Sequence, residues 1–214
     1  TLGYLTPRSL DTVAALGELL SSQIVAAAFR HRGYPAAWVD ARDVMKTNDF
    51  FTRAEPDVDA IALAAQQYLL PLLQQGQIAV MGGFVGSAPG RVTTTLGRGG
   101  SDYTASLIGA AIGATAIEIW TDVDGMLTAD PRVVPGAQLI ERISFDEAAE
   151  LAAFGAKVLH PRCLLPVRQY GIPLSVYATQ APALGGTRIS DSPAGEGGQV
   201  KAICTRNGVT LVSM

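Results

Sequence analysis

Segments of helical and of extended periodicity alternate along this chain of 214 residues, and that alternation limits the folds open to it. Apolar residues recur at helical spacing over 9–32, from Pro56 to about Gln75, from near Ser101, after Ser144 and from Pro161 to Tyr170. Short apolar runs predict strands at Ala36–Val39, Ile78–Met81, Ala116–Trp120 and Pro173–Tyr177. After the second of these strands we expect a long glycine-rich loop. Strands separated by helices predict an α/β fold whose mostly parallel sheet carries helices on both faces.

Ser144 and Glu147 form the sequence pattern of a capping box. In this motif the hydroxyl of the first residue and the carboxylate three positions later each accept a hydrogen bond from the other residue's backbone N–H. The pattern therefore predicts that a helix begins directly after Ser144.

Charge and cysteine usage exclude several classes of protein. The net charge is −3 and no block of Lys and Arg occurs, so we expect neither a nucleic-acid surface nor an anionic-membrane surface. Cys163 and Cys204 are far apart, and His31 and His160 have no partners at ligand spacing, so no protein metal site is expected. Free cysteines fit a cytoplasmic protein. We expect no signal peptide and no apolar run long enough to span a bilayer.

Three glycines surround Arg98 in the segment TTTLGRGGSD, from Thr93 to Asp102. Glycines let backbone N–H groups approach an anion closely, and the helix that follows adds a partial positive charge at its first turn. An arginine can hold a carboxylate with two parallel hydrogen bonds. The alternative is a plain loop in which Ser101 or Asp102 caps the helix. We favour an anion-binding loop, which lacks the Gly-Lys-Ser/Thr ending of a Walker A motif.

A second polar segment runs from Trp120 to Arg132 and leaves the end of a predicted strand, where open α/β sheets bind ligands. Asp122, Asp124 and Asp130 could seat ribose hydroxyls or magnesium, and Arg132 could contact a phosphate. Taken alone, the segment is better explained as a polar loop whose aspartates bond their own backbone.

Three further polar residues have no decisive pattern of their own. Lys157, in FGAKVLHPR, could neutralise a triphosphate or could contact the last carbonyls of a helix, and the spacing favours neither. His160 precedes a proline and reads as a structural, hydrogen-bonded residue. Glu18 lies in an apolar helical stretch and, from that stretch alone, reads as a surface residue.

Four segments resemble those of aspartate kinases, a branch of the amino-acid kinase family. They are NDFFTRAEPD, TTTLGRGGSDYTA, IWTDVDGMLTADPR and FDEAAELAAFGAKVLHPR, and they occur in the family's order over essentially the whole chain. The resemblance implies phosphorylation of the side-chain carboxylate of L-aspartate to 4-phospho-L-aspartate by ATP with Mg²⁺. That reaction is the first step of lysine, threonine and methionine biosynthesis.

The same resemblance implies a three-layer αβα sandwich of the carbamate kinase-like type, with a mostly parallel central sheet. It implies a catalytic domain over 1–189. The composition of 190–199 predicts a linker, and alternation in Val200–Cys204 and Val209–Met214 around Asn207-Gly208 predicts a hairpin over 200–214. This hairpin resembles the first strands of an ACT regulatory domain. The family's opening strand and its Lys-Phe-Gly-Gly-Thr-Ser phosphate loop are absent from this sequence. We therefore expect weak or no activity from these 214 residues alone, and a homodimer or higher oligomer for the full-length protein.

The resemblance also implies roles for individual residues. Arg98 resembles the residue that clamps the aspartate carboxylates, Glu18 the acid that receives the α-ammonium group, and Phe84 a wall of the pocket. The rest of this pocket is implied at Gly99, Gly100, Ser101 and Asp102. ATP contacts are implied at Thr121, Asp122, Leu127, Arg132, Lys157 and Val158, where Leu127 stands in place of a tyrosine of some relatives. Lys157 and Asp102 are the implied catalytic residues, and no metal ligand is assigned among the side chains.

Two other functions remain open at this point. One is a sibling kinase that acts on another acid, such as glutamate. The other is a non-catalytic ligand-binding subunit, which the missing phosphate loop would suit.

Overall fold

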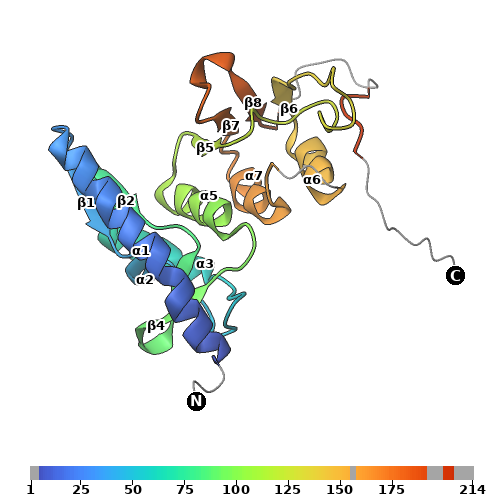
Figure 1. The fold of residues 1–214 in the computed structure, drawn as a ribbon. Helices are drawn as coiled ribbons and strands as arrows, with labels where there is room; N and C mark the ends of the chain where they lie inside the picture. The colour runs from blue at the N-terminus through green and yellow to red at the C-terminus, as the bar shows by residue number, and fades with distance from the viewer. Residues whose placement is uncertain (1–4, 155–157, 192–199, 205–214) are drawn as a thin grey trace, which may run out of the picture. The chain divides into compact units, whose positions relative to one another are not determined.

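The computed structural model describes residues 5–154, 158–191 and 200–204. The chain divides into two compact units, Thr1–Ala114 and Thr115–Met214. Figure 1 traces both units in chain order, with the first in blue to green and the second in green to red.

The first unit is built on two parallel strands, β1 (Ala36–Val39) and β2 (Ile78–Met81), whose register pairs Ala36 with Ile78. Both strands have the bounds expected from their apolar runs. The long helix α1 (Pro7–His31) packs on them and begins at Thr6, whose hydroxyl accepts a hydrogen bond from Ser9 N at 3.1 Å. Proline at its first position costs no hydrogen bond there.

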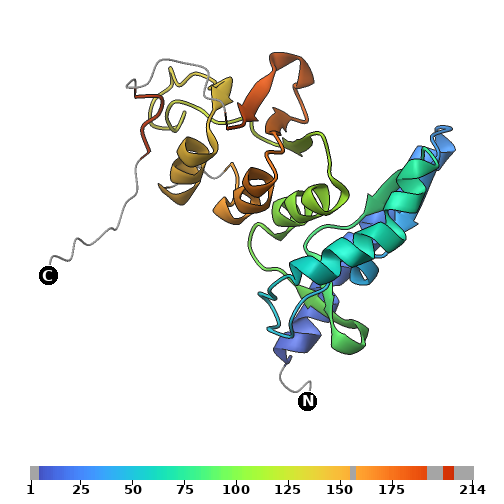
Figure 2. The same cartoon turned by 180° about the vertical axis from the view of Figure 1, so that it is seen from behind.

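Helices cover both faces of this strand pair. Figure 1 shows α1 on one face, and Figure 2 shows α3 (Val58–Tyr68) with α4 (Leu70–Gln74) on the other. The packing follows the alternation of side chains along β1, because Trp38 contacts the cluster that contains Ala15 and Leu19 of α1. Its neighbour Val39 packs with Ala64, Ala65 and Leu69.

The helix expected from Pro56 to Gln75 is two helices that meet at Leu69, not one. Pro71 explains the break. It has no N–H to donate to the carbonyl four residues earlier, so a continuous α-helix cannot pass through it without losing a bond.

The expectation of a long glycine-rich loop after β2 was wrong, because this segment contains an antiparallel hairpin. Strands β3 (Val85–Ala88) and β4 (Val92–Thr95) pair from Val85–Thr95 to Ala88–Val92, around a 3₁₀ turn at Pro89–Arg91. Their sequences, VGSA and VTTT, show no apolar alternation because the buried residues include Ser87, Thr94 and Thr95. The Thr94 hydroxyl is satisfied by that of Thr47, at 2.7 Å.

An ion cluster ties the turn of this hairpin to α2 (Ala41–Val44). Arg42 Nη2 lies 2.6 Å from Asp40 Oδ2, and Arg91 Nη2 lies 3.0 Å from the same oxygen. Arg91 Nε also lies 2.9 Å from Asp43 Oδ1. Burial by itself would raise the pKa of the Asp40 carboxyl, but hydrogen bonds from Arg42 and the charges of both arginines outweigh it and hold that pKa below its ordinary value.

Asp40→Asn should therefore lower the free energy of unfolding by about 2 kcal/mol at pH 7, the scale of charge-assisted hydrogen bonds. The pKa of Asp40 is lower in the folded protein than its ordinary value of 3.8. Its contribution to stability is thus complete above that value and is lost as the pH falls through the folded pKa. Urea unfolding at pH 7, 5 and 3 checks this. The gap between wild type and variant should be equal at pH 7 and 5 and smaller at pH 3; an equal gap at all three pH values would contradict it.

The second unit is built on a four-stranded sheet in the order β5–β7–β8–β6. Its strands are β5 (Ile117–Thr121), β6 (Arg142–Ile143), β7 (Leu174–Ala178) and β8 (Gly186–Ile189). β5 pairs with β7 in parallel, as does β6 with β8, whereas β7 and β8 are antiparallel. The α/β class and the mostly parallel pairing are confirmed, and β6 and β8 are strands that the sequence did not predict.

The predicted capping box is confirmed at the start of α6 (Phe145–Phe154). Ser144 N donates to Glu147 Oε2 at 2.9 Å, and Glu147 N donates to Ser144 Oγ at 3.2 Å. The helix expected from Pro161 to Tyr170 is a 3₁₀ turn at Pro161–Cys163 followed by α7 (Leu164–Gln169).

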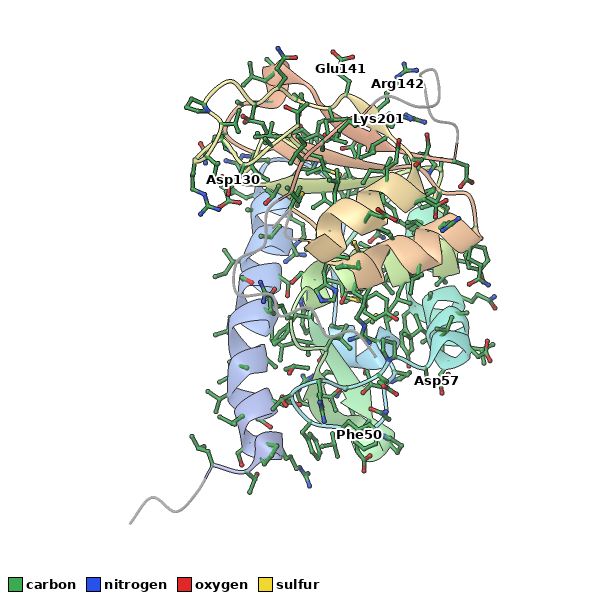
Figure 3. All side chains as sticks on the ribbon, turned by 90° about the vertical axis from the view of Figure 1, so that its right-hand side faces the viewer. Phe50, Asp57, Asp130, Glu141, Arg142 and Lys201 are labelled. Atoms are coloured by element: carbon green, nitrogen blue, oxygen red, sulfur yellow. The ribbon has the colours of Figure 1, made fainter. Side chains whose placement is uncertain are left out.

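Residues 200–204 do not form the expected strand. Ile203 N donates to Thr128 O at 2.9 Å, and Lys201 Nζ lies 2.9 Å from Glu147 Oε1 (Figure 3 labels Lys201). Most of the expected linker, 192–199, and the rest of the expected hairpin, 205–214, lie outside the described residues. The division into catalytic and ACT domains stays a prediction.

Helix α1 is long and apolar enough, by length and composition, to cross a membrane, which the sequence analysis did not expect. A core helix of a globular protein passes the same test. In the structure α1 buries Asp11, Ala15, Leu19, Ser22 and Ala26, and it packs on β1, β2 and β4. We therefore describe it as a packed helix of the first unit.

Candidate functional site

The glycine loop connects β4, not β2, to helix α5 (Gly100–Ile112). Gly97 and Gly99 take positive φ angles of 73° and 69°, which L-residues with side chains adopt rarely. Gly99 is the N-cap of α5, so neither Ser101 nor Asp102 caps this helix. Ser101 is exposed in the first helical turn, where backbone N–H groups have no partner earlier in the helix and can face an anion.

Close packing between glycines and side chains brings the predicted substrate residues of the first unit together. A Cβ atom added to Gly82 would lie 3.1 Å from the carbonyl oxygen of Glu18. One added to Gly83 would lie 3.0 Å from Cα of Ser101, and one added to Gly100 would lie 2.9 Å from Phe84 Cδ2. These approaches leave no room for a methyl group, so the segment after β2 fits between α1 and the start of α5.

Phe84 holds a strained backbone at the centre of this arrangement. Its φ angle is 65°, a region that a bulky residue rarely adopts. Its N–H donates to Thr104 Oγ1 of α5 at 3.1 Å, and its carbonyl accepts from Leu96 N, directly after β4, at 2.9 Å. Both hydrogen bonds hold the backbone of Phe84 in place. Strain maintained in this way is typical of binding sites.

Glu18 and Arg98 carry opposite charges, and both belong to the first unit. Glu18 is half-buried and Arg98 is exposed, and in the part of the chain that the structure describes neither forms an ion pair within the molecule. A carboxylate that can receive an ammonium group and a guanidinium that can hold a carboxylate would together suit a zwitterion. In the sequence, only the family resemblance points to Glu18. Its approach to Gly82 could not be read from its own helix.

Asp11 is a residue of this region that the sequence analysis missed. Its side chain is buried and accepts hydrogen bonds from Thr52 N and from both the N–H and the hydroxyl of Thr95. The only signal in the sequence was a carboxylate in the apolar stretch of α1, and its partners lie 41 and 84 positions away.

In the second unit, the predicted nucleotide residues begin where β5 ends. Thr121 is the last residue of that strand, and its hydroxyl donates to Asp122 Oδ1 at 3.1 Å. Asp122 is exposed, and Val158 is half-buried. Lys157 lies outside the described residues.

Arg132 is engaged locally in this unit. Its Nη2 lies 2.6 Å from Asp130 Oδ2, and its backbone N–H donates to Asp130 Oδ1 at 2.9 Å (Figure 3 labels Asp130). The hydrogen bonds that the Arg132 guanidinium donates to Asp130 raise the pKa of Arg132. Asp130 thus bonds to the backbone of its own segment, as expected if this segment is a plain polar loop. Leu127 lies nearby in an isolated bridge to Leu139.

Comparison with known proteins points to one family. The profile of the amino acid kinase family matches residues 4–177. The chain is 49% identical over 184 residues to lysine-sensitive aspartokinase 3 of Escherichia coli K12, covering 86% of this chain and 41% of that protein. It is 37% identical over 221 residues to the chloroplastic bifunctional aspartokinase/homoserine dehydrogenase 1 of Zea mays, covering 99% of this chain and 23% of that protein.

A solved structure gives the same result. The E. coli aspartokinase III structure in complex with aspartate and ADP, in the R-state, matches with a TM-score of 0.85 and 47% identity, covering 90% of this chain and 43% of that one. The chain thus spans less than half the length of these relatives. Because the family profile matches most of the sequence, the chain belongs to the amino acid kinase family.

Proposed function

We propose that the protein carrying this chain is an aspartate kinase, which transfers the γ-phosphoryl group of ATP to the side-chain carboxylate of L-aspartate. The observation that supports this most is the convergence of Glu18, Phe84 and the loop around Arg98 in one unit. The similarity to an aspartokinase solved with aspartate and ADP supports the same substrate pair.

In this proposal the first unit binds the acceptor. Arg98 holds a carboxylate of aspartate, and Glu18 receives its α-ammonium group. Phe84 forms a wall together with Gly100, whose own N–H donates to Gly97 O at 3.1 Å. Gly99 and Ser101 offer backbone N–H groups at the start of α5. The charges of this pocket complement an amino acid with a second carboxylate better than a nucleotide or a neutral metabolite.

The reaction needs no base to activate the acceptor, since an aspartate carboxylate is already a nucleophile at neutral pH. Its oxygen forms a bond to the γ-phosphorus, and the bond from that phosphorus to the β–γ bridging oxygen breaks, which releases ADP. The protein's contribution is to align the carboxylate and to neutralise charge on the phosphoryl group. We assign neutralisation to Lys157, Arg132 and the loop amides, and we keep Asp102, in the first turn of α5, as the second candidate catalytic residue.

In this proposal magnesium enters the site as part of Mg-ATP. Among the described residues no group of three His, Cys, Asp or Glu side chains could hold a metal. Mg²⁺ in kinases takes most of its ligands from phosphates and water, with one or two carboxylates, and Asp122 is an exposed carboxylate at the end of β5. When bound, the ion would neutralise phosphate charge. A cytoplasmic location and an oligomeric full-length enzyme accompany the proposal.

Aspartate-dependent formation of ADP from Mg-ATP tests the proposal. The assay uses the complete protein that contains this chain, with L-glutamate as the control acid. We expect turnover with aspartate and not with glutamate. Equal turnover with both acids would make the protein a less selective kinase, and no turnover with either would favour a non-catalytic binding subunit.

A further inference from the structure

Asp11 of α1 is a buried carboxylate with 1% of its surface exposed. It accepts hydrogen bonds from three donors, each at an ordinary distance. Thr52 N lies 3.0 Å from Oδ1 and 2.9 Å from Oδ2, Thr95 N lies 3.0 Å from Oδ2, and Thr95 Oγ1 lies 2.8 Å from Oδ1. A carboxylate is buried this deeply only when such bonds compensate for the water it loses.

Thr52 needs this support because its backbone is strained. Its φ angle is 70°, in a region that is an outlier for a β-branched residue and that persists only when the surroundings hold it. Its carbonyl oxygen lies 3.0 Å from the position that a Cβ atom on Gly97 would occupy. Thr52 therefore lies directly against the first glycine of the loop.

Thr95 precedes the same glycine by two positions in the chain. It is the last residue of β4, and its carbonyl accepts from Ala54 N at 2.8 Å. The next residue, Leu96, donates its N–H to Phe84 O at 2.9 Å. Asp11 thus joins the 52–54 segment to the end of β4 at the point where the chain enters the loop that carries Arg98.

We infer that Asp11 is a positioning residue for the acceptor pocket: through Thr52 and Thr95 it fixes the entrance of the loop and so the place of Arg98. The inference rests on the proposed function only in naming that pocket as the aspartate site. Asparagine replaces the carboxylate only in part. Its amide oxygen can take the place of Oδ2, but its NH₂ group then lies where Oδ1 accepts from Thr52 N, and the negative charge that strengthens these bonds is lost.

The test compares Asp11→Asn with a matched control, Asp57→Asn, in the complete protein. Asp57 is also a carboxylate of the first unit that accepts from a backbone N–H, that of Ala60 at 3.0 Å, but it caps α3 instead of supporting the loop (Figure 3). We expect Asp11→Asn to raise the KM for L-aspartate about tenfold or more, the equivalent of about 1.4 kcal/mol, with the KM for ATP within about twofold of wild type. Because asparagine caps a helix about as well as aspartate, Asp57→Asn should leave the melting temperature nearly unchanged and both KM values unchanged.

A second pair of variants and a second measurement distinguish a positioning effect from a general loss of folding. Thr95→Val removes one donor to Asp11 and should also raise the KM for aspartate, whereas Thr95→Ser keeps the hydroxyl and should not. Amide hydrogen exchange should become faster around Gly97 in Asp11→Asn and stay unchanged around the Ser144 capping box. An aspartate KM within twofold of wild type, or unchanged exchange around Gly97, would overturn the positioning role. Absence of aspartate turnover in the wild type would instead overturn the proposed function, and exchange alone would then decide whether Asp11 fixes the loop.

Discussion

Arg98→Met in the complete protein should lower kcat/KM for L-aspartate by about a thousandfold. Removing one partner of a buried, hydrogen-bonded charge pair costs about 2–5 kcal/mol, much of it because the other charge is left unpaired, and each 1.4 kcal/mol is a factor of ten. In the free protein Arg98 is exposed. The loss should therefore fall on aspartate binding, with little change in melting temperature. Steady-state kinetics with varied aspartate at saturating Mg-ATP measures it.

Two further variants separate charge from geometry at this position. Arg98→Lys keeps the charge but cannot make two parallel bonds to a carboxylate, so it should recover only part of the lost kcat/KM. Arg32→Met removes an exposed arginine at the C-terminal end of α1 and should behave as wild type. An Arg98→Met enzyme with kcat/KM within threefold of wild type would remove Arg98 from the acceptor site.

Much of the local structure could be predicted from the sequence because its signals are local. The apolar runs of β1 and β2 stand between turn residues, and the structure gives them the expected bounds. The capping box at Ser144 depends on two residues three positions apart. Such patterns need no knowledge of the rest of the fold.

The hairpin of β3 and β4 could not be predicted because its core is polar. Thr94 is buried and bonded to Thr47, a partner 47 positions away, so its strand shows neither alternation nor a continuous apolar run. The role of Asp11 could not be predicted either, because its partners are also distant in the sequence. In its own helix it reads as an isolated charge, and its function as an acceptor for Thr52 and Thr95 appears only once distant segments are in place.

The candidate site shows the same division. The glycine loop around Arg98 carries its own signal, since glycines before a helix indicate close backbone approach. Glu18 carries none, and only its contact with Gly82 distinguishes it from a surface glutamate. A loop such as the one around Arg98 is thus visible as a motif, whereas single residues such as Glu18 and Asp11 become candidates only through packing between distant elements.

Lys157→Met should have the opposite kinetic signature from Arg98→Met. If Lys157 neutralises charge on the transferring phosphoryl group, its interaction is strongest in the transition state, and its loss should lower kcat by about a hundred- to a thousandfold. The KM for aspartate should stay within about threefold, because the proposed acceptor pocket is in the first unit and is unchanged.

The matched control is Lys201→Met, which removes a second-unit lysine that pairs with Glu147 at 2.9 Å. That change should cost at most about 1 kcal/mol of stability and leave kcat unchanged. A Lys157→Met enzyme with wild-type kcat, or one whose loss appears only in the KM for aspartate, would show that phosphoryl neutralisation is carried by other groups.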